Sequence, residues 1–167
     1  MIVWRIIRKE FLHSPLSVEG AKAWPGRWHS AGTAILYTAS TESLALLEKF
    51  VHLALEFRVI PHVKLCIELP EAACVEVFED VAKKLPDWRG ADPTAARAFG
   101  DHWARHSAAL GLSVPSVLSS SERNLLLRAA SPHFEALNII SAEEFLYDER
   151  MWKGENRATQ KRPLRKV

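Results

Sequence analysis

The sequence predicts a single mixed α+β domain, on three observations. The chain has 167 residues, 48% of them hydrophobic, which is enough for one ordinary core and too few for two typical domains. Apolar and polar residues alternate as in strands over residues 2–7 and 63–69. Helical periodicity occupies residues 40–56 and 92–111, between and after these segments. Strands separated irregularly by helices are typical of α+β domains rather than of regular βαβ repeats.

The first strand has two faces of different character. One carries Ile2, Trp4 and Ile6, and the other carries Val3, Arg5 and Ile7. A long turn-rich loop follows over residues 13–32, with three glycines and two prolines. Long loops inside compact domains are usually functional or disordered, and the tryptophans in this one argue against disorder. Residues 34–38 then read as a short buried strand.

The first long helix is expected to start at an N-cap on Ser40 and to run to about Glu56, with Glu42 in its first turn, where the helix dipole favours an anion. Positions of one helical face are occupied by Leu44, Glu48, Val51 and Leu55. Glu48 therefore lies within an apolar stripe. A buried carboxylate costs several kcal/mol unless it is paired or hydrogen-bonded.

Two interpretations of Glu48 follow. It could form a structural ion pair with Arg27 or Arg5 inside the core. It could instead line a cleft together with Arg27 and the tyrosine Tyr37, which ends the strand before the helix. The sequence alone leaves both open.

The remainder of the chain predicts further short elements. Pro70 ends the strand at residues 63–69, and Asp92-Pro93 is a good start for the second long helix, which is expected to end near Gly111. Residues 113–121 look like a loop. The expected minor elements are short strands at 74–78, 125–127 and 137–140, a helical turn at 81–85, and a second turn at 141–144 from a capping-box pattern.

Charge is distributed unevenly along the chain. The net charge is +2, but residues 153–167 contain six basic residues and one acidic residue, so residues 1–152 carry a net charge of −3. A nucleic-acid-binding domain needs a basic stripe on a folded face, so direct nucleic acid binding is not expected. The division predicted is a domain over residues 1–152 and a mobile basic tail over residues 153–167.

Several other functional classes are disfavoured. Two cysteines, Cys66 and Cys74, need no disulfide framework and suit a reducing compartment. No run of about 18 apolar residues and no signal-peptide pattern is present, so a cytoplasmic protein is expected without membrane association. No glycine-rich nucleotide loop occurs. His102 and His106 have helical spacing but lack the acidic neighbour of a zinc-protease motif, so no metal site is predicted.

Several segments together resemble the RES-domain toxin family. They cover residues 1 to about 152 in the family's order and spacing, which makes the resemblance specific. The matching segments are Trp4-Arg5-Ile6, Gly26-Arg27-Trp28-His29 with Gly32, Ile35 to Ser40, Ala45-Leu46-Leu47-Glu48, Val114-Pro115-Ser116, Glu122 with Asn124, and Asp148 with Arg150. The chain departs from the family after Asn124, where Arg128, Ala129 and Ser131 replace an asparagine, proline and histidine pattern.

The resemblance implies a fold similar to ADP-ribosyltransferase toxins and NAD as a consumed substrate, with no resident cofactor. Carried over by position, the catalytic residues are Arg27, Tyr37, Glu48 and Ser116, and the substrate-binding residues are Trp28, His29, Glu122 and Asn124. The family's toxins act in type II toxin–antitoxin pairs. The implied partner is an Xre-type helix-turn-helix antitoxin, and a homodimer within that complex is compatible with the family.

These residue types suit cleavage of the nicotinamide–ribose bond. Positive charge grows on the ribose as that bond breaks, and the Glu48 carboxylate would stabilise it. Arg27 offers a planar fork for the pyrophosphate, and the Tyr37 ring can stack on nicotinamide. Ser116 could hydrogen-bond the ribose or the carboxamide. It has no obvious base and is not expected to be a nucleophile.

Three functional hypotheses remain at this level. The favoured one is NAD cleavage with water or inorganic phosphate as the acceptor. In the second, ADP-ribose is transferred to a protein. Many protein-modifying relatives carry a carboxylate two residues before the catalytic one, where this chain has Leu46. The third is a non-catalytic interaction module in which Arg27 and Glu48 are a structural pair.

Overall fold

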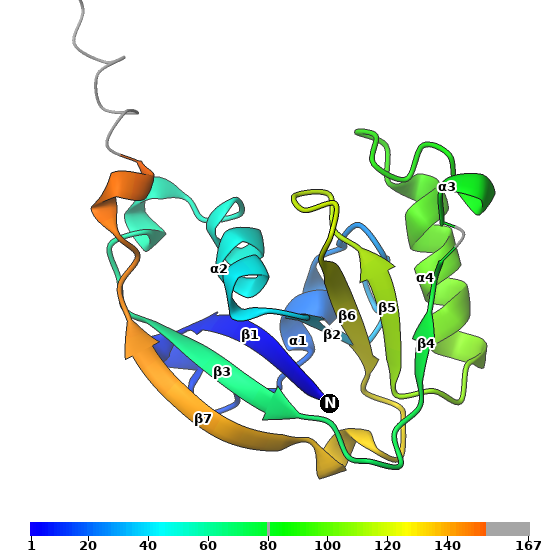
Figure 1. Cartoon of the computed structure of the whole chain (residues 1–167), viewed down its shortest axis with the longest axis horizontal. Coiled ribbons are helices and arrows are strands. Elements are labelled where there is room, and N and C mark those ends of the chain that lie inside the picture. Colours follow the sequence, from blue (N-terminus) through cyan, green and yellow to red (C-terminus); the bar gives the residue numbers. More distant parts are fainter. Residues whose placement is uncertain (80, 153–167) are drawn as a thin grey trace, which may run out of the picture.

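A computed structural model describes residues 1–79 and 81–152 and shows one strongly curved mixed sheet with helices packed on it (Figure 1). The described residues form a seven-stranded sheet in the order β4-β5-β6-β2-β1-β3-β7. The strands are β1 Ile2–Arg8, β2 Ile35–Ala39, β3 His62–Glu68, β4 Val75–Val77, β5 Gly111–Pro115, β6 Arg123–Arg128 and β7 Asn138–Phe145. The α-helices are α1 Glu19–Ala23, α2 Glu42–Phe50, α3 Val81–Lys84 and α4 Thr94–His106, with 3-10 turns η1 Lys9–Phe11, η2 Leu55–Phe57, η3 Phe134–Ala136 and η4 Glu149–Met151.

The sheet divides between its two middle strands. β1 pairs with β3 along its whole length and β2 pairs with β6 along its whole length, but β1 and β2 share a single paired position, Trp4 with Ala39. Beyond that position the two strands diverge. A backbone carbonyl on the open side of β2 therefore needs a partner other than its neighbouring strand.

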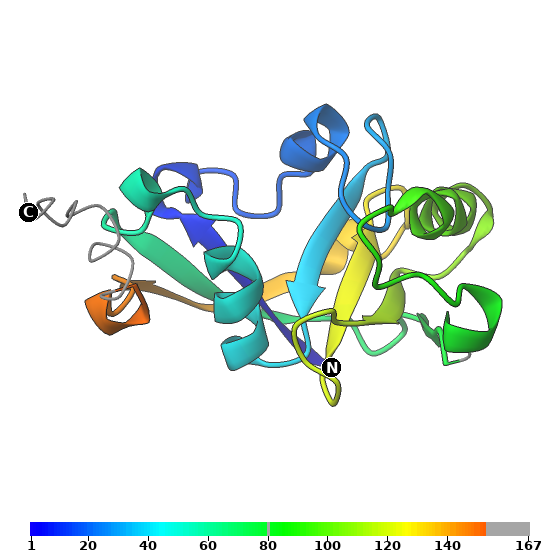
Figure 2. The ribbon, with the colours of Figure 1, turned by 90° about the horizontal axis from the view of Figure 1, so that it is seen from above.

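Two helices flank the diverging strands. α2 lies beside β1 and α4 beside β5, on opposite sides of the β2–β6 pair (Figures 1 and 2). The α2 contact buries Ile6, Ala39, Leu44 and Ala45. The α4 contact buries an aromatic cluster around Trp28, Trp88 and Trp103. A third cluster joins both halves of the sheet through residues such as Val3, Leu36, Leu65 and Leu127.

Most of the expected strands are confirmed, while four element predictions were wrong. The first long helix starts after an N-cap on Thr41 and ends at Phe50, and Val51 and Leu55 are exposed rather than buried. The second ends at His106, not near Gly111. Residues 111–115 are strand β5 rather than helix end and loop, because both edges of this glycine- and proline-containing segment find partners, β4 and β6. The expected helical turn at 141–144 is part of β7, which continues to Phe145 along β3.

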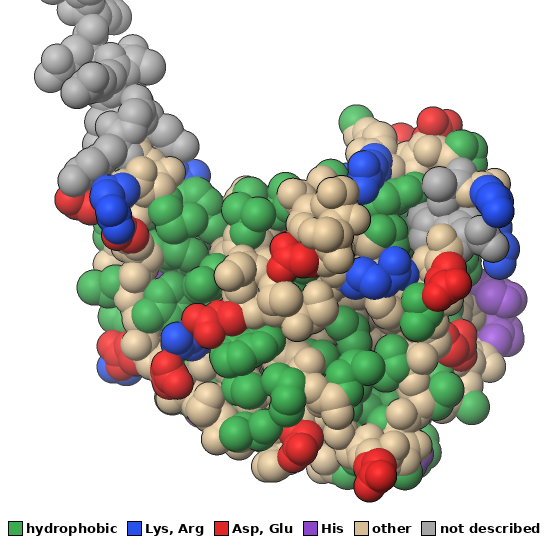
Figure 3. Space-filling view, viewed as in Figure 1, with side chains coloured by type: hydrophobic (Ala, Val, Ile, Leu, Met, Phe, Trp, Pro, Cys, Tyr) green, Lys and Arg blue, Asp and Glu red, His purple; other side chains and the backbone are tan. Residues whose placement is uncertain are grey.

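Two further expectations concern the surface and the ends of the chain. The basic tail at residues 153–167 lies outside the described residues, so its mobility stays a prediction. Within the described part, no helix is long and apolar enough to cross a bilayer. On the face drawn in Figure 3, basic side chains are interspersed with acidic and apolar ones and form no continuous stripe.

Candidate active site

A cleft opens where β1 and β2 diverge. Its volume is about 830 Å³, within the range of small-molecule sites. The lining comes from β1, the end of α1, loop 25–29, β2, the last turn of α2, the start of α4 and the β5–β6 connection. The split in the sheet thus creates a site to which segments from most of the chain contribute.

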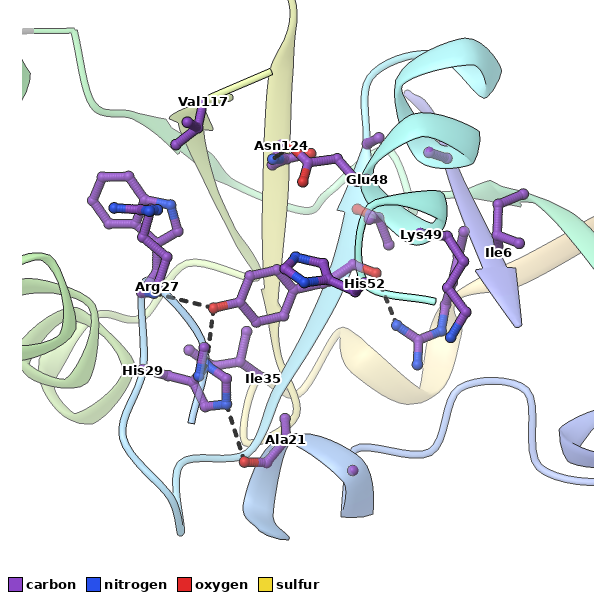
Figure 4. A pocket seen from close by; sticks show the side chains of 18 of the residues that line it. Ile6, Ala21, Arg27, His29, Ile35, Glu48, Lys49, His52, Val117 and Asn124 are labelled. Atoms are coloured by element: carbon purple, nitrogen blue, oxygen red, sulfur yellow. Dashed lines mark hydrogen bonds between the residues drawn. The ribbon is translucent and has the colours of Figure 1, made fainter. Parts of the chain in front are cut away.

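Glu48 lies in this cleft with its carboxylate held by two neutral donors. Ser116 Oγ donates to Glu48 Oε1 at 2.7 Å, and Asn124 Nδ2 donates to the same oxygen at 2.6 Å. Figure 4 shows Glu48 and Asn124 facing each other at one side of the cleft. Among the described residues, Glu48 forms no ion pair with Arg27 or Arg5, so the structural ion-pair interpretation was wrong. These two hydrogen bonds to one oxygen fix the orientation of the carboxylate without neutralising its charge.

Ser116 supports Glu48 from behind. Its side chain is fully buried, and its Oγ accepts hydrogen bonds from the backbone N–H groups of Leu118 at 2.9 Å and Ser119 at 3.3 Å while donating to Glu48. The hydroxyl is therefore saturated by protein groups. Ser116 is a positioning residue for Glu48, and the structure leaves no room for the expected contact of its hydroxyl with ribose or carboxamide.

Tyr37 is fixed by loop 26–29. Its hydroxyl accepts from the Trp28 N–H at 3.2 Å and lies 2.8 Å from His29 Nδ1. His29 Nε2 faces two carbonyl oxygens, those of Ala21 at 3.0 Å and Trp24 at 3.1 Å, so Nε2 carries a proton, while Nδ1 beside the Tyr37 hydroxyl also accepts from the Gly26 N–H at 3.1 Å. Burial raises the pKa of Tyr37 above its ordinary value. Tyr37 is thus a neutral ring held in place, suited to stacking rather than to proton abstraction.

A glycine is required beside this pair. A Cβ on Gly26 would lie 2.7 Å from both the Tyr37 hydroxyl and His29 Cε1.

His29 and Trp28 were expected to bind substrate. Both border the cleft but are only 2% exposed, so they act mainly as its buried wall, with Trp28 packed against Phe78, Trp88 and Phe99.

Arg27 reaches across the mouth of the cleft to the segment before α4. Its Nη1 donates to the carbonyl oxygens of Trp88 at 2.6 Å and Gly90 at 3.0 Å. The remaining donors of the fork have no hydrogen-bond partner among the described residues and border the cleft. One edge of the guanidinium therefore fixes the loop, and the other is available to an anionic ligand.

Glu122, the remaining expected substrate-binding residue, lies outside the cleft. Its carboxylate accepts a hydrogen bond from Thr41 Oγ1, and Thr41 is the N-cap of α2. The physical reason is the helix N-terminus, where an anion is favoured. The prediction for Glu122 is corrected accordingly: this residue anchors the start of the helix that carries Glu48.

Three cationic side chains in the cleft were not assigned to the site by sequence reasoning: Arg5, Lys49 and Arg97. Arg5 could have been found, because it is the charged residue on an apolar strand face. Lys49 and Arg97 gave no such signal. With Arg27 they make four basic residues against one acidic residue, Glu48, although residues 1–152 as a whole are net negative. The cleft is therefore electrostatically complementary to an anionic ligand. No metal-binding group of His, Cys, Asp or Glu occurs among the described residues.

Comparison with known proteins agrees with this geometry. The RES domain family matches residues 2–148, and the chain belongs to that family. Toxin Res of Photorhabdus laumondii is 31% identical over 92% of this chain and 99% of its own length. The Prs ADP-ribosylating toxin of a Sphingobium species is 34% identical over 89% of this chain and 94% of its own length.

A solved structure supports the fold. The M. tuberculosis MbcT–MbcA toxin–antitoxin complex contains a chain that superposes with a TM-score of 0.66, at 17% identity, covering 87% of this chain and 84% of that one. The expected fold class, a single mixed α+β domain, is thereby confirmed.

Proposed function

We propose that this chain is the toxin of a toxin–antitoxin pair and that it consumes NAD by breaking the nicotinamide–ribose bond. The observation that carries the proposal is Glu48, a carboxylate held by Ser116 and Asn124 in a cleft that also contains Arg5, Arg27, Lys49 and Arg97. NAD offers the matching groups. Its pyrophosphate is anionic, and the ribose becomes cationic as nicotinamide leaves.

Each cleft residue has a role in this reaction. Arg27 binds the pyrophosphate through the donors that Trp88 and Gly90 do not use. The Tyr37 ring, fixed through its hydroxyl by His29, stacks on the nicotinamide. Glu48 stabilises the charge that develops on the ribose, while Ser116 and Asn124 hold its orientation. This preorganisation is the main way in which such a site lowers a barrier.

Water or inorganic phosphate is the proposed acceptor. A protein acceptor needs a group that orients it, and the position two residues before Glu48 is Leu46, which packs against the α2 core cluster. The name of the Sphingobium relative, Prs ADP-ribosylating toxin, supports protein modification as the second candidate. Incubation with labelled NAD separates the two candidates. A small acceptor releases free ADP-ribose or its phosphate ester, whereas a protein acceptor becomes labelled itself.

The deciding experiment is nicotinamide release from NAD by the purified chain. Glu48→Gln keeps the shape and removes the charge, so we expect at least about a hundredfold lower turnover with an unchanged thermal unfolding midpoint. Glu56→Gln, the same change at an exposed position after α2, is the matched control and should be fully active. A folded Glu48→Gln protein with wild-type turnover would refute the mechanism, and a wild-type chain that releases no nicotinamide would leave the interaction-module hypothesis.

The antitoxin belongs to the same proposal. The similarity to the Toxin Res proteins and to a chain of the MbcT–MbcA toxin–antitoxin complex supports a cognate partner. We expect an Xre-type antitoxin that covers the cleft beside Arg27. Expression of this chain alone should deplete cellular NAD and arrest growth, and co-expression with the product of the neighbouring gene should restore both. Normal growth and NAD levels with abundant folded chain would count against a toxin.

A further inference from the structure

The four cations of the cleft differ in how they are satisfied. Arg27 donates to two backbone carbonyls, and Arg97 Nε donates to the Gly26 carbonyl at 2.7 Å. Both belong to the wall formed by loop 26–29 and α4. Arg5 and Lys49 belong to the other side, formed by β1 and the end of α2; Arg5 has one hydrogen bond with a further donor unsatisfied, and the Lys49 side chain has no partner among the described residues.

Arg5 is a buried cation with an unsatisfied donor. Because β1 and β2 have already diverged at this point, the Tyr37 carbonyl lacks a strand partner, and Arg5 Nη1 donates to it at 2.8 Å. Arg5 Nε is buried and has no hydrogen-bond partner. Burial lowers the pKa of Arg5 to about 10. A charged group with an unsatisfied buried donor is unfavourable, and an anion beside the guanidinium would offset that cost through its charge.

Lys49 brings a second charge to the same place. Its side chain descends from the last turn of α2 on the side of the cleft opposite Arg27 (Figure 4). It forms no ion pair among the described residues. Burial and then the neighbouring charges of Arg5 and Arg8 lower the pKa of Lys49. Arg8 is paired with Glu10, so Arg5 and Lys49 are the two that repel each other without compensation.

We propose that Arg5 and Lys49 form a second oxyanion subsite that takes a phosphate group. Arg5 and Lys49 are both partly buried, border the cleft and have no carboxylate partner among the described residues, so an anion that approaches both side chains from the cleft is stabilised by their charges. The subsite lies across Tyr37 and Glu48 from Arg27. The inference rests on the proposed function for the identity of the substrate, and the phosphate has two sources: a phosphate group of NAD itself, or free inorganic phosphate that accepts the ADP-ribosyl group.

The second source gives a balanced reaction. The bond between ribose C1′ and the nicotinamide nitrogen breaks, and its electron pair leaves on neutral nicotinamide. A lone pair of a hydrogenphosphate oxygen forms the new C–O bond at C1′. The phosphate proton stays on the ester or exchanges with water, and no oxidant or reductant is needed.

The first test measures binding without NAD turnover. Inorganic phosphate and ADP-ribose are each titrated into the full chain and followed by ³¹P NMR. Lys49→Gln removes the charge and no hydrogen bond of the fold, so it should fold and should bind at least one of the two ligands about tenfold more weakly. Lys9→Gln is the matched control, because Lys9 is exposed and paired with Glu144. Wild-type affinity of Lys49→Gln for both ligands would overturn the subsite.

The second test identifies the source by kinetics of nicotinamide release. If free phosphate is the ligand, the rate depends on phosphate, the product is the phosphate ester of ADP-ribose, and Lys49→Gln raises only the KM for phosphate. If the ligand is a phosphate of NAD, the rate is independent of phosphate and the KM for NAD rises. Either pattern supports the subsite, and unchanged KM values for both substrates contradict it. A wild-type chain that releases no nicotinamide would refute the proposed function, and the NMR titration would still decide the subsite.

Discussion

Loop 26–33, which carries Arg27, is bonded to α4 along its length, whereas the end of α2 is bonded at Glu48 and Leu46 but leaves the Lys49 side chain without a hydrogen-bond or ion-pair partner among the described residues. α4 contributes three consecutive contacts on one face. Arg97 donates to the Gly26 carbonyl, Asp101 Oδ1 accepts from the Ser30 N–H at 2.9 Å and the Thr33 hydroxyl at 2.7 Å, and Gly100 packs directly on the loop backbone. Near its end α2 receives hydrogen bonds from Ser116 and Asn124 to the Glu48 carboxylate and from the Tyr147 hydroxyl to the Leu46 carbonyl at 3.0 Å, and the Phe50 ring packs on Tyr147.

The electrostatics of the two walls differ in the same direction. In the α4 wall, burial opposes ionisation of Asp101, but hydrogen bonds from Ser30 and Thr33 outweigh it and lower the pKa of this carboxyl. In the α2 wall, burial lowers the pKa of Lys49 and Arg5, and of these two side chains only Arg5 has a hydrogen bond, from its Nη1 to the Tyr37 carbonyl. The α4 wall is therefore satisfied by the protein itself, whereas the α2 wall leaves Lys49 and the Arg5 Nε without a partner among the described residues. A binding site can combine the two kinds of wall, because a rigid wall positions the reacting groups and unsatisfied groups bind the ligand.

The largest expected effect on stability comes from disrupting the contact between α4 and loop 26–33. A Cβ on Gly100 would lie 1.8 Å from the Trp28 carbonyl oxygen, so Gly100→Ala must displace the loop or the helix. We expect a loss of about 3 kcal/mol or more in the free energy of unfolding, measured by urea denaturation. Gly20→Ala is the control, because nothing lies within 4 Å of a Cβ there. Equal stability of the two variants would show that α4 does not brace the loop.

Arg27→Lys is a smaller change in the wall formed by loop 26–33 and α4. One ammonium group cannot hold both the Trp88 and the Gly90 carbonyls and still present a fork to a pyrophosphate. We expect the KM for NAD to rise about tenfold or more, with a smaller change in kcat and an intact fold. Arg150→Lys, at an exposed residue paired with Asp148 outside the cleft, should leave both constants unchanged. Unchanged constants for Arg27→Lys would remove Arg27 from the site.

The smallest expected effect is that of the Lys49 charge on the stability of the ligand-free chain. Because the Lys49 pKa is lowered on folding, the unfolded chain binds more protons between that pKa and the ordinary lysine value of about 10.4. Wild-type stability therefore rises with pH through this window, and the charge is destabilising below it. Lys49→Met should raise the free energy of unfolding by roughly 1 kcal/mol or less at pH 7. Its advantage over wild type should shrink toward pH 10, as followed by urea denaturation. A destabilised Lys49→Met chain at pH 7 would mean that the two walls are equally satisfied.

Local patterns were sufficient for the fold class and for most strands. The alternation over residues 2–7 and 63–69 predicted β1 and β3, because a strand with one buried face must alternate. β5 could not be predicted in this way. Its glycine, serine and proline have little strand preference, and the segment is a strand only because β4 and β6 supply partners on both edges. The length of α2 was overestimated for the converse reason: Val51 and Leu55 continue the helical spacing but meet no packing partner and remain exposed.

For the site, the sequence by itself determined which side chains we expect to carry the chemistry: Arg27, Tyr37 and Glu48, from their residue types, their motifs and the anomaly of a carboxylate in an apolar stripe. The tertiary structure decided how each is used. In the structure Ser116 holds Glu48, His29 holds Tyr37, and Glu122 is bonded to the N-cap of α2. The structure also places Arg5, Lys49 and Arg97 in the cleft. The physical reason is the divergence of β1 from β2, which follows from the pairing of distant strands. Charge, burial and hydrogen-bond partners in the cleft are set by that pairing and not by neighbours in the chain.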